Sequence, residues 1–210
     1  ASNKTITNDI SGGLTVAGLT FNGTGYTIGG TESITLNGDV TVSSASSTND
    51  IDTPLVLGSN MSFTAGTSSL TLNGTLDLST YTATFTGASV ILNGVISSGA
   101  GGSIVHSGGY LDIHSPNTFL GTFSSTSGVV SAYNKLAFGN STTGSTFGAN
   151  SSLALSTSIT VDETWAEPFT FNGAPNAGPS AKIIAYGDSP NVAGAAGPYY
   201  ILSGAITIGA

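Results

Sequence analysis

One short phrase recurs along this chain: a run of alternating apolar and small polar residues, an Asn-Gly pair, and a second such run. It occurs at 33–42, 69–78 and 89–96. Repeats of this size cannot bury their apolar face alone, so they are stabilised by stacking on their neighbours. The repetition indicates an array of supersecondary units, and such arrays serve as scaffolds more often than as catalysts.

Period-2 alternation of apolar residues with Ser and Thr runs through residues 10–165, and no stretch shows a helical period. This alternation is typical of half-buried strands and predicts an all-β chain. The alternating pairs are Ile34/Leu36, Val40/Val42, Leu55/Leu57, Met61/Phe63, Leu70/Leu72, Leu76/Leu78, Leu111/Ile113, Leu136/Phe138, Leu153/Leu155 and Ile159/Val161.

Two folds are compatible with these strands. A spacing of about 20 residues matches one turn of a parallel β-helix, in which inward residues of successive turns stack. This reading predicts a buried column of Leu72, Leu92, Ile113, Leu136 and Leu155. An Asn-Gly pair between alternating runs is also the signal for a tight hairpin, which predicts an antiparallel β-sandwich. Both folds would use Asn and Gly for positive φ.

The composition excludes several classes of partner. Only 7% of the residues are charged, Arg is absent, and the net charge is −8. A chain with three lysines offers no basic stripe for nucleic acid or for an anionic membrane surface. The absence of Cys excludes disulfides and thiolate metal sites and fits an exported protein. We find no phosphate loop or other cofactor motif, and no apolar run long enough for membrane insertion.

The chain divides at residue 165. Residues 1–165 form the predicted repeat region, whereas 166–210 contain five of the seven prolines. We interpret 166–210 as a Pro/Gly-rich cap or junction, because a solenoid end needs a cap against edge aggregation. Two strand-like termini, Thr5–Ile10 and Tyr199–Ile208, are candidates for adding to a neighbour's sheet. The start, Ala1-Ser2-Asn3, is that of a processed terminus or a fragment.

Three polar clusters are candidate sites. His106, Asp112 and His114 form the densest, and alternation places Asp112 and His114 on one outward face, as in half of a metal or acid/base site. The oxygen-rich group Asn49, Asp50 and Asp52 has ligand types that suit Ca²⁺, but it lacks the spacing of a calcium loop, and a turn before Pro54 is the favoured interpretation. Asp162, Glu163 and Glu167 flank Trp165, as sugar-cleaving carboxylates or as a charged edge that shields the strand stack. None of these spacings specifies a catalytic residue.

Six Asn-x-Ser/Thr triplets are possible glycosylation sites, although a chain rich in these residues produces such triplets by chance. They begin at Asn3, Asn22, Asn60, Asn73, Asn140 and Asn150.

Residues 102–121 resemble the autotransporter-associated β-strand repeat, whose pattern is Gly-x-Leu-x-Lys-x-Gly followed by x-Leu-x-Leu-x-x-x-Asn-Thr-Tyr-x-Gly. His106 replaces the usual Lys, and one residue is missing after Gly108. Looser relatives occur at 19–26 and 61–96. The resemblance implies a right-handed β-helix of the passenger type on a bacterial surface, and it carries over no catalytic residue. The matching positions are Gly102, Ile104, Gly108, Leu111, Ile113, Asn117, Thr118, Phe119 and Gly121.

These observations predict a non-enzymatic extracellular surface protein, a β-helical stalk or adhesin segment whose partners are cell-surface components, glycans or other copies of itself. An alternative is a self-assembling filament or surface-layer subunit that exchanges terminal strands. A polysaccharide-active enzyme is a third reading, but the chain lacks the Arg base and paired aspartates that those β-helical enzymes use.

Overall fold

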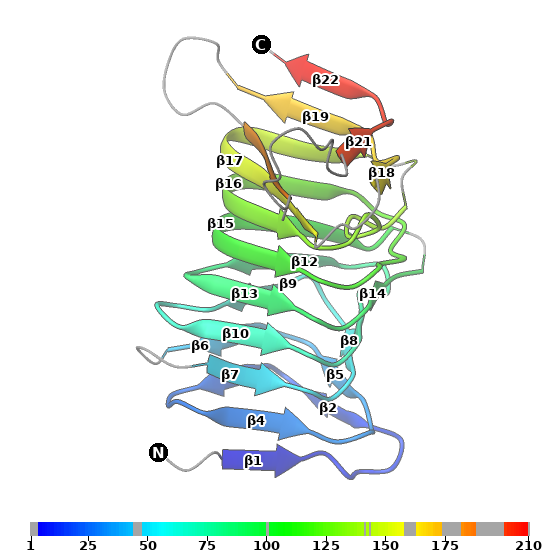
Figure 1. The fold of residues 1–210 in the computed structure, drawn as a ribbon. Coiled ribbons are helices and arrows are strands. Elements are labelled where there is room, and N and C mark those ends of the chain that lie inside the picture. The colour runs from blue at the N-terminus through cyan, green and yellow to red at the C-terminus, as the bar shows by residue number, and fades with distance from the viewer. Residues whose placement is uncertain are drawn as a thin grey trace.

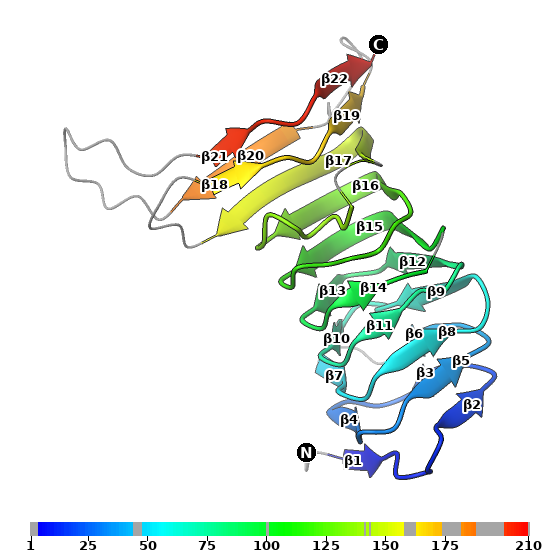
Figure 2. The same cartoon turned by 90° about the vertical axis from the view of Figure 1, so that its right-hand side faces the viewer.

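The computed structural model describes residues 4–43, 48–99, 101–140, 142, 144–157, 163–173, 182–187 and 200–209. Its regular structure is entirely β, and every described strand pairing is parallel. The chain rises through about seven turns of a right-handed coil (Figures 1 and 2). The parallel β-helix is therefore confirmed, and the antiparallel sandwich is wrong.

Each lower turn contributes one strand to each of three faces. Face 1 contains β1 (Lys4–Thr7), β4 (Tyr26–Gly29), β7 (Thr48–Ile51), β10 (Ser69–Leu72) and β13 (Ser89–Leu92). Face 2 contains β2 (Leu14–Val16), β5 (Ile34–Leu36), β8 (Leu55–Leu57), β11 (Leu76–Asp77) and β14 (Ile96–Ser97). Face 3 contains β3 (Leu19–Phe21), β6 (Val40–Val42), β9 (Met61–Thr64) and β12 (Thr82–Thr86).

In the upper turns, three long strands bend around the corner from face 3 to face 1. They are β15 (Ser103–Ile113), β16 (Phe123–Ala132) and β17 (Ser145–Thr157). The start of β15 pairs with β12 and its end pairs with β13, so this strand joins the two faces into one sheet.

Three of the four described strands after residue 165 extend the same sheet, and the fourth forms a separate two-stranded sheet with the strand that ends at Trp165. β19 (Phe169–Asn172) pairs with β17 on face 3, and β22 (Ile206–Gly209) pairs with β19. β20 (Lys182–Gly187) pairs with β17 on face 1, and β18 (Glu163–Trp165) pairs with β21 (Tyr200–Leu202). The parallel pairing thus crosses the expected boundary between 1–165 and 166–210.

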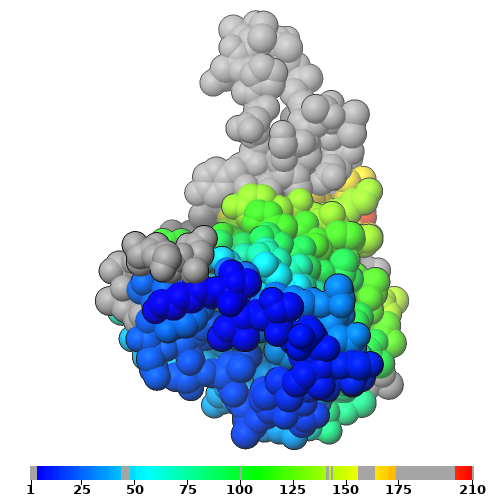
Figure 3. All heavy atoms as spheres, turned by 90° about the horizontal axis from the view of Figure 1, so that it is seen from below, coloured from blue at the N-terminus to red at the C-terminus, as the bar shows by residue number. Residues whose placement is uncertain are grey.

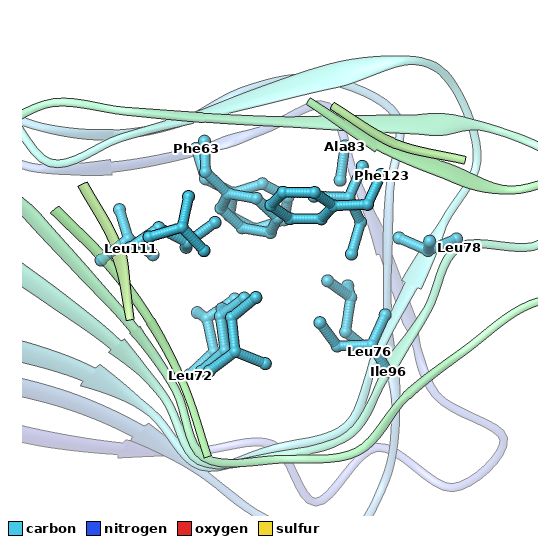
Figure 4. Close-up of a cluster of buried hydrophobic side chains, with 14 of the residues drawn as sticks. Phe63, Leu72, Leu76, Leu78, Ala83, Ile96, Leu111 and Phe123 are labelled. Atoms are coloured by element: carbon cyan, nitrogen blue, oxygen red, sulfur yellow. The ribbon is translucent and has the colours of Figure 1, made fainter. Parts of the chain in front are cut away.

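The predicted column on face 1 exists and is buried, except that Ala132 takes the place predicted for Leu136. Leu72 lies beside Leu92, which lies beside Ile113 in the next turn. Ala132 takes the next place, and Leu155 follows it. All five side chains are buried, and Figure 4 shows Leu72 among the ranks of side chains that fill the centre from three sides. Because the column repeats once per turn, the core is continuous.

The prediction for Leu136 was wrong. This residue lies in a turn after β16, where its N–H donates to Asn134 Oδ1 (2.9 Å). The turn is closed by Ala137 N–H, which donates to the Asn134 carbonyl (2.9 Å). Ala137 and Phe138 are buried, whereas Leu136 is 48% exposed. The turn, which period-2 alternation does not reveal, directs Leu136 outward.

The Asn-Gly pairs form corners, but glycine has a different role there than expected. Neither Gly74 nor Gly94 has a positive φ. A Cβ at Gly94 would lie 1.9 Å from the Gly74 carbonyl oxygen, so close stacking of the turns requires glycine at this position. Positive φ is found at other glycines, for example at Gly87 (104°) and Gly109 (78°) in the corner between faces 3 and 1.

The three copies of the repeated phrase are not structurally equivalent. Asn73-Gly74 and Asn93-Gly94 turn the chain from face 1 to face 2. Asn37-Gly38 lies between β5 and β6 and turns it from face 2 to face 3. The same dipeptide therefore serves two different corners, where in each case the preceding turn approaches too closely for a Cβ.

Candidate functional site

His106 faces the core and is separated from Asp112 and His114. Its imidazole is buried between Phe85 and Ser125 in neighbouring turns of face 3. Nδ1 lies 3.0 Å from Ser125 Oγ, and buried Nε2 has no hydrogen-bond partner. Burial lowers the pKa of His106 to about 4, although a hydrogen bond with the Gly108 backbone partly offsets this. His106 is therefore a neutral core residue at pH 7.

Asp112 and His114 share the outward side of face 1, as alternation predicted. Asp112 is half-buried and His114 is exposed. The His114 ring stacks on the Tyr133 ring of the next turn, with centroids 4.1 Å apart and planes 7° from parallel. The register shifts between His106 and Tyr110 form a β-bulge that reverses which residues of β15 point inward. This reversal keeps His106 apart from the other two.

Asn49, Asp50 and Asp52 do not form an oxygen cluster. Asn49 and Asp50 belong to strand β7, not to a loop, so their side chains point to opposite sides. Asn49 is buried, and its Oδ1 accepts a hydrogen bond from the Tyr26 N–H (3.1 Å). Burial raises the pKa of Asp50; a hydrogen bond from Thr71 lowers it, and the Asp52 carboxylate raises it again. These three side chains therefore do not converge on one position where Ca²⁺ could bind.

Asp52 begins a ladder of hydrogen bonds that runs up the corner between faces 1 and 2. Asn73 Nδ2 donates to Asp52 Oδ1 (2.7 Å), and Asn93 Nδ2 donates to Asn73 Oδ1 (2.8 Å). We did not anticipate this ladder from the sequence, although Asn recurs after each of two strands of face 1. Side chains bonded from turn to turn strengthen the stack and leave fewer groups for chemistry.

Glu167 and Trp165 lie inside the upper turns, so the prediction of a charged edge is wrong for Glu167. Both side chains are buried, and Trp165 Nε1 has no hydrogen-bond partner among the described residues. Ser145 Oγ donates to Glu167 Oε1 (2.6 Å). Burial raises the pKa of Glu167 to about 7, and the bond from Ser145 opposes this shift. Asp162 and the side chain of Glu163 lie outside the described residues, so no carboxylate pair is assembled here.

The predicted glycosylation residues differ in their surroundings. Asn22, Asn60, Asn73 and Asn150 are exposed, Asn140 is half-buried, and Asn3 lies outside the described residues. Asn60 Oδ1 accepts from the Thr82 N–H (2.9 Å), and Asn73 belongs to the corner ladder. A glycan is attached to the side-chain nitrogen, so it would compete with the bond from Asn73 Nδ2 to Asp52 and leave the Oδ1 acceptor of Asn60 in place.

Within the described ranges, no group of three or more His, Asp or Glu side chains is placed to hold a metal ion. These ranges also contain no helix with the length and apolar character of a membrane span. Comparison with protein-family models, curated proteins and solved structures gives no match for this chain.

Proposed function

We propose that this chain is a non-enzymatic structural segment, a β-helical stalk displayed outside the cell. The observation that carries the proposal is that its polar side chains bind neighbouring turns instead of converging on a cleft. Asp52, Asn73 and Asn93 form one such ladder. Asn117 forms another link, because its Oδ1 accepts from Ile96 N–H (2.8 Å) and its Nδ2 donates to the Ala137 carbonyl (2.7 Å).

A stalk must stay extended and have no locally weak turn, and the described turns suit this role. Parallel pairing and apolar columns continue from turn to turn on each face, so each turn is supported by its neighbours. A surface rich in Ser, Thr and Asn with few ions interacts weakly with charged polymers. The absence of Cys is compatible with a place outside the cell but does not by itself select it.

The length of the rod tests the stalk. Residues 69–88 make one full turn, because Ser69 is in register with Ser89. Tandem copies of 69–88 inserted after residue 88 should lengthen the particle by about 4.8 Å per copy, the spacing of adjacent strands. Small-angle scattering measures this increment, with Gly/Ser inserts of equal length as controls. A length that does not grow in these steps, or turnover of polysaccharides by the purified chain, would contradict the proposal.

A filament subunit is the second candidate, favoured by the open edges of the terminal strands. Among the described strands β22 pairs only with β19, along one edge, and its Ile208 is 82% exposed. At the other end, seen in Figure 3, an apolar groove of about 270 Å³ is lined by Ile6, Phe21 and Ile28. Apolar strand edges favour further parallel strands, supplied by the same chain or by another copy.

Concentration dependence separates these two sources of strands. An assembly of copies should show particles that lengthen with protein concentration in sedimentation velocity, and Ile208→Lys should abolish the growth. Thr207→Lys on the same strand is the matched control for added charge. Particles whose size is independent of concentration would remove the filament candidate and leave the stalk.

A further inference from the structure

Exposed aromatic rings concentrate at one place on face 1. Tyr110 is 58% exposed and Tyr133 is 37% exposed, on adjacent turns. Every other Tyr, Phe and Trp whose side chain is described is buried or half-buried. Because the other described rings are buried or half-buried, the large exposed fractions of these two rings point to contact with a ligand.

Tyr110, Asp112 and His114 form a row of outward side chains, and Tyr133 of the next turn stacks on His114 at its end. We call these four residues the tyrosine strip. The first three alternate along β15 and the residue after it, so Tyr110 and His114 are about 13 Å apart at a rise of about 3.3 Å per residue. The stack of His114 on Tyr133 fixes both rings before any ligand arrives. In the next turn Val129 lies beside Tyr110 and Ser131 lies beside Asp112, so these two residues border the strip.

Asp112 is half-buried but lacks the partners that Asp39, Asp77 and Asp52 have. Asp39 Oδ1 accepts from Ser62 N–H (2.7 Å), Asp77 Oδ1 accepts from Ser79 N–H (2.7 Å), and Asp52 belongs to the corner ladder. No hydrogen bond or ion pair to the Asp112 carboxylate is found within the described residues. A half-buried acceptor between aromatic rings is thus left available for a donor from outside the chain.

We propose that the tyrosine strip binds a neutral, extended oligosaccharide. A sugar ring presents apolar C–H faces, which pack on aromatic rings whose faces carry negative charge density. It also presents hydroxyl groups, which donate to the Asp112 carboxylate. The ligand is uncharged, because Asp112 on a chain of net charge −8 repels anionic polymers and the strip offers little apolar area to a protein. This inference adds recognition to the stalk and does not depend on the filament candidate.

Titration of the full chain with oligosaccharides of the cello-, xylo-, manno- and chito- series tests the strip. Amide NMR spectra should show saturable shifts at Tyr110, Asp112 and Tyr133 for at least one series. Tyr110→Ala and Tyr133→Ala should each weaken binding about tenfold, since one ring contact contributes about 1.4 kcal/mol. Asp112→Asn, which removes charge and keeps the shape, should also weaken it.

The matched control is Leu120→Ala, which removes an exposed apolar side chain outside the strip. It should bind as the parent does, and circular dichroism should show that all four variants remain folded. The proposal is overturned if no series shifts the strip at millimolar sugar. Equal binding by the parent and the Tyr variants overturns it too, as does binding of only acidic polysaccharides or peptides to the strip.

Discussion

The buried imidazole of His106 makes a specific prediction about acid stability. Above pH 6.5 the imidazole is neutral in both the folded and the unfolded chain, so it does not alter the free energy of unfolding. As the pH falls below 6.5, His106 binds a proton in the unfolded chain but stays neutral in the folded chain until about pH 4. Stability is therefore lost between these two pH values.

The size of the loss follows from the two pKa values. The gap between 6.5 and about 4, at about 1.36 kcal/mol per pKa unit, corresponds to about 3 kcal/mol. The total free energy of unfolding of a native protein is about 5–15 kcal/mol, so this single group affects a large share of it. The cause is burial, because His106 is covered by the core and its Nε2 has no partner to stabilise a charge.

The perturbation is His106→Phe combined with Ser125→Ala. Phenylalanine continues the column above Phe85, and the second change avoids leaving Ser125 Oγ unpaired. Urea unfolding of parent and variant at pH values from 7.5 to 4 gives two stability profiles. We expect the free energy of unfolding of the variant to rise by about 3 kcal/mol relative to that of the parent as the pH falls over this range. Ser125→Ala alone retains the buried imidazole and should retain the acid loss.

One result would refute the reasoning: a stability difference between variant and parent that stays constant from pH 7.5 to 4. An imidazole proton resonance that titrates at an ordinary histidine pH would refute it independently.

Three further predictions follow from burial and close contacts. The free energy of unfolding of Glu167→Gln should rise by about 3 kcal/mol relative to the parent between pH 4.5 and 8, measured by urea unfolding. The reason is that the parent loses stability as the pH rises from 4.5 through the folded pKa of about 7. Parallel stability profiles of the two proteins would contradict burial of the acid. Leu92→Ala should lower the free energy of unfolding by about 2–5 kcal/mol, whereas exposed Leu136→Ala should stay within about 0.5 kcal/mol. Gly94→Ala should cost at least about 2 kcal/mol in thermal unfolding, whereas Gly29→Ala, where an added Cβ meets nothing within 4 Å, should cost less.

Much of the fold could be predicted from the sequence because its main determinant is local. Alternation along each strand places Leu72, Leu92 and Ile113 inward, and their spacing of about one turn brings them into one column. The failure at Leu136 is also local in cause: the Asn134 side chain closes a turn, and a turn breaks period-2 alternation.

The corners could not be predicted from the Asn-Gly dipeptide, because their character depends on the neighbouring turn. Gly94 is required by the carbonyl of Gly74 in the turn below, which no local pattern records. The dipeptide at 37–38 looks the same and occupies another corner, since position within a turn is set by the register of the whole stack.

The candidate sites failed for a related reason. His106, Asp112 and His114 fall at even spacing, and simple alternation assigns them to one side. The bulge between His106 and Tyr110 reverses the alternation, and glycines 108 and 109, both at positive φ, allow that bulge. The sequence contained this signal as a Gly-Gly pair within the strand pattern.

The same geometry explains how one chain combines a stable column with a recognition surface. Side chains of a strand alternate between the core and the solvent, so the inward column sets stability and the outward column is free to vary. Leu111 and Ile113 are fully buried, while Tyr110 and Asp112 between and beside them face outward. Substitutions in the tyrosine strip should therefore alter binding while the midpoint of unfolding stays close to that of the parent. A loss of stability as large as that of Leu92→Ala in any strip variant would show that these rings support the fold instead.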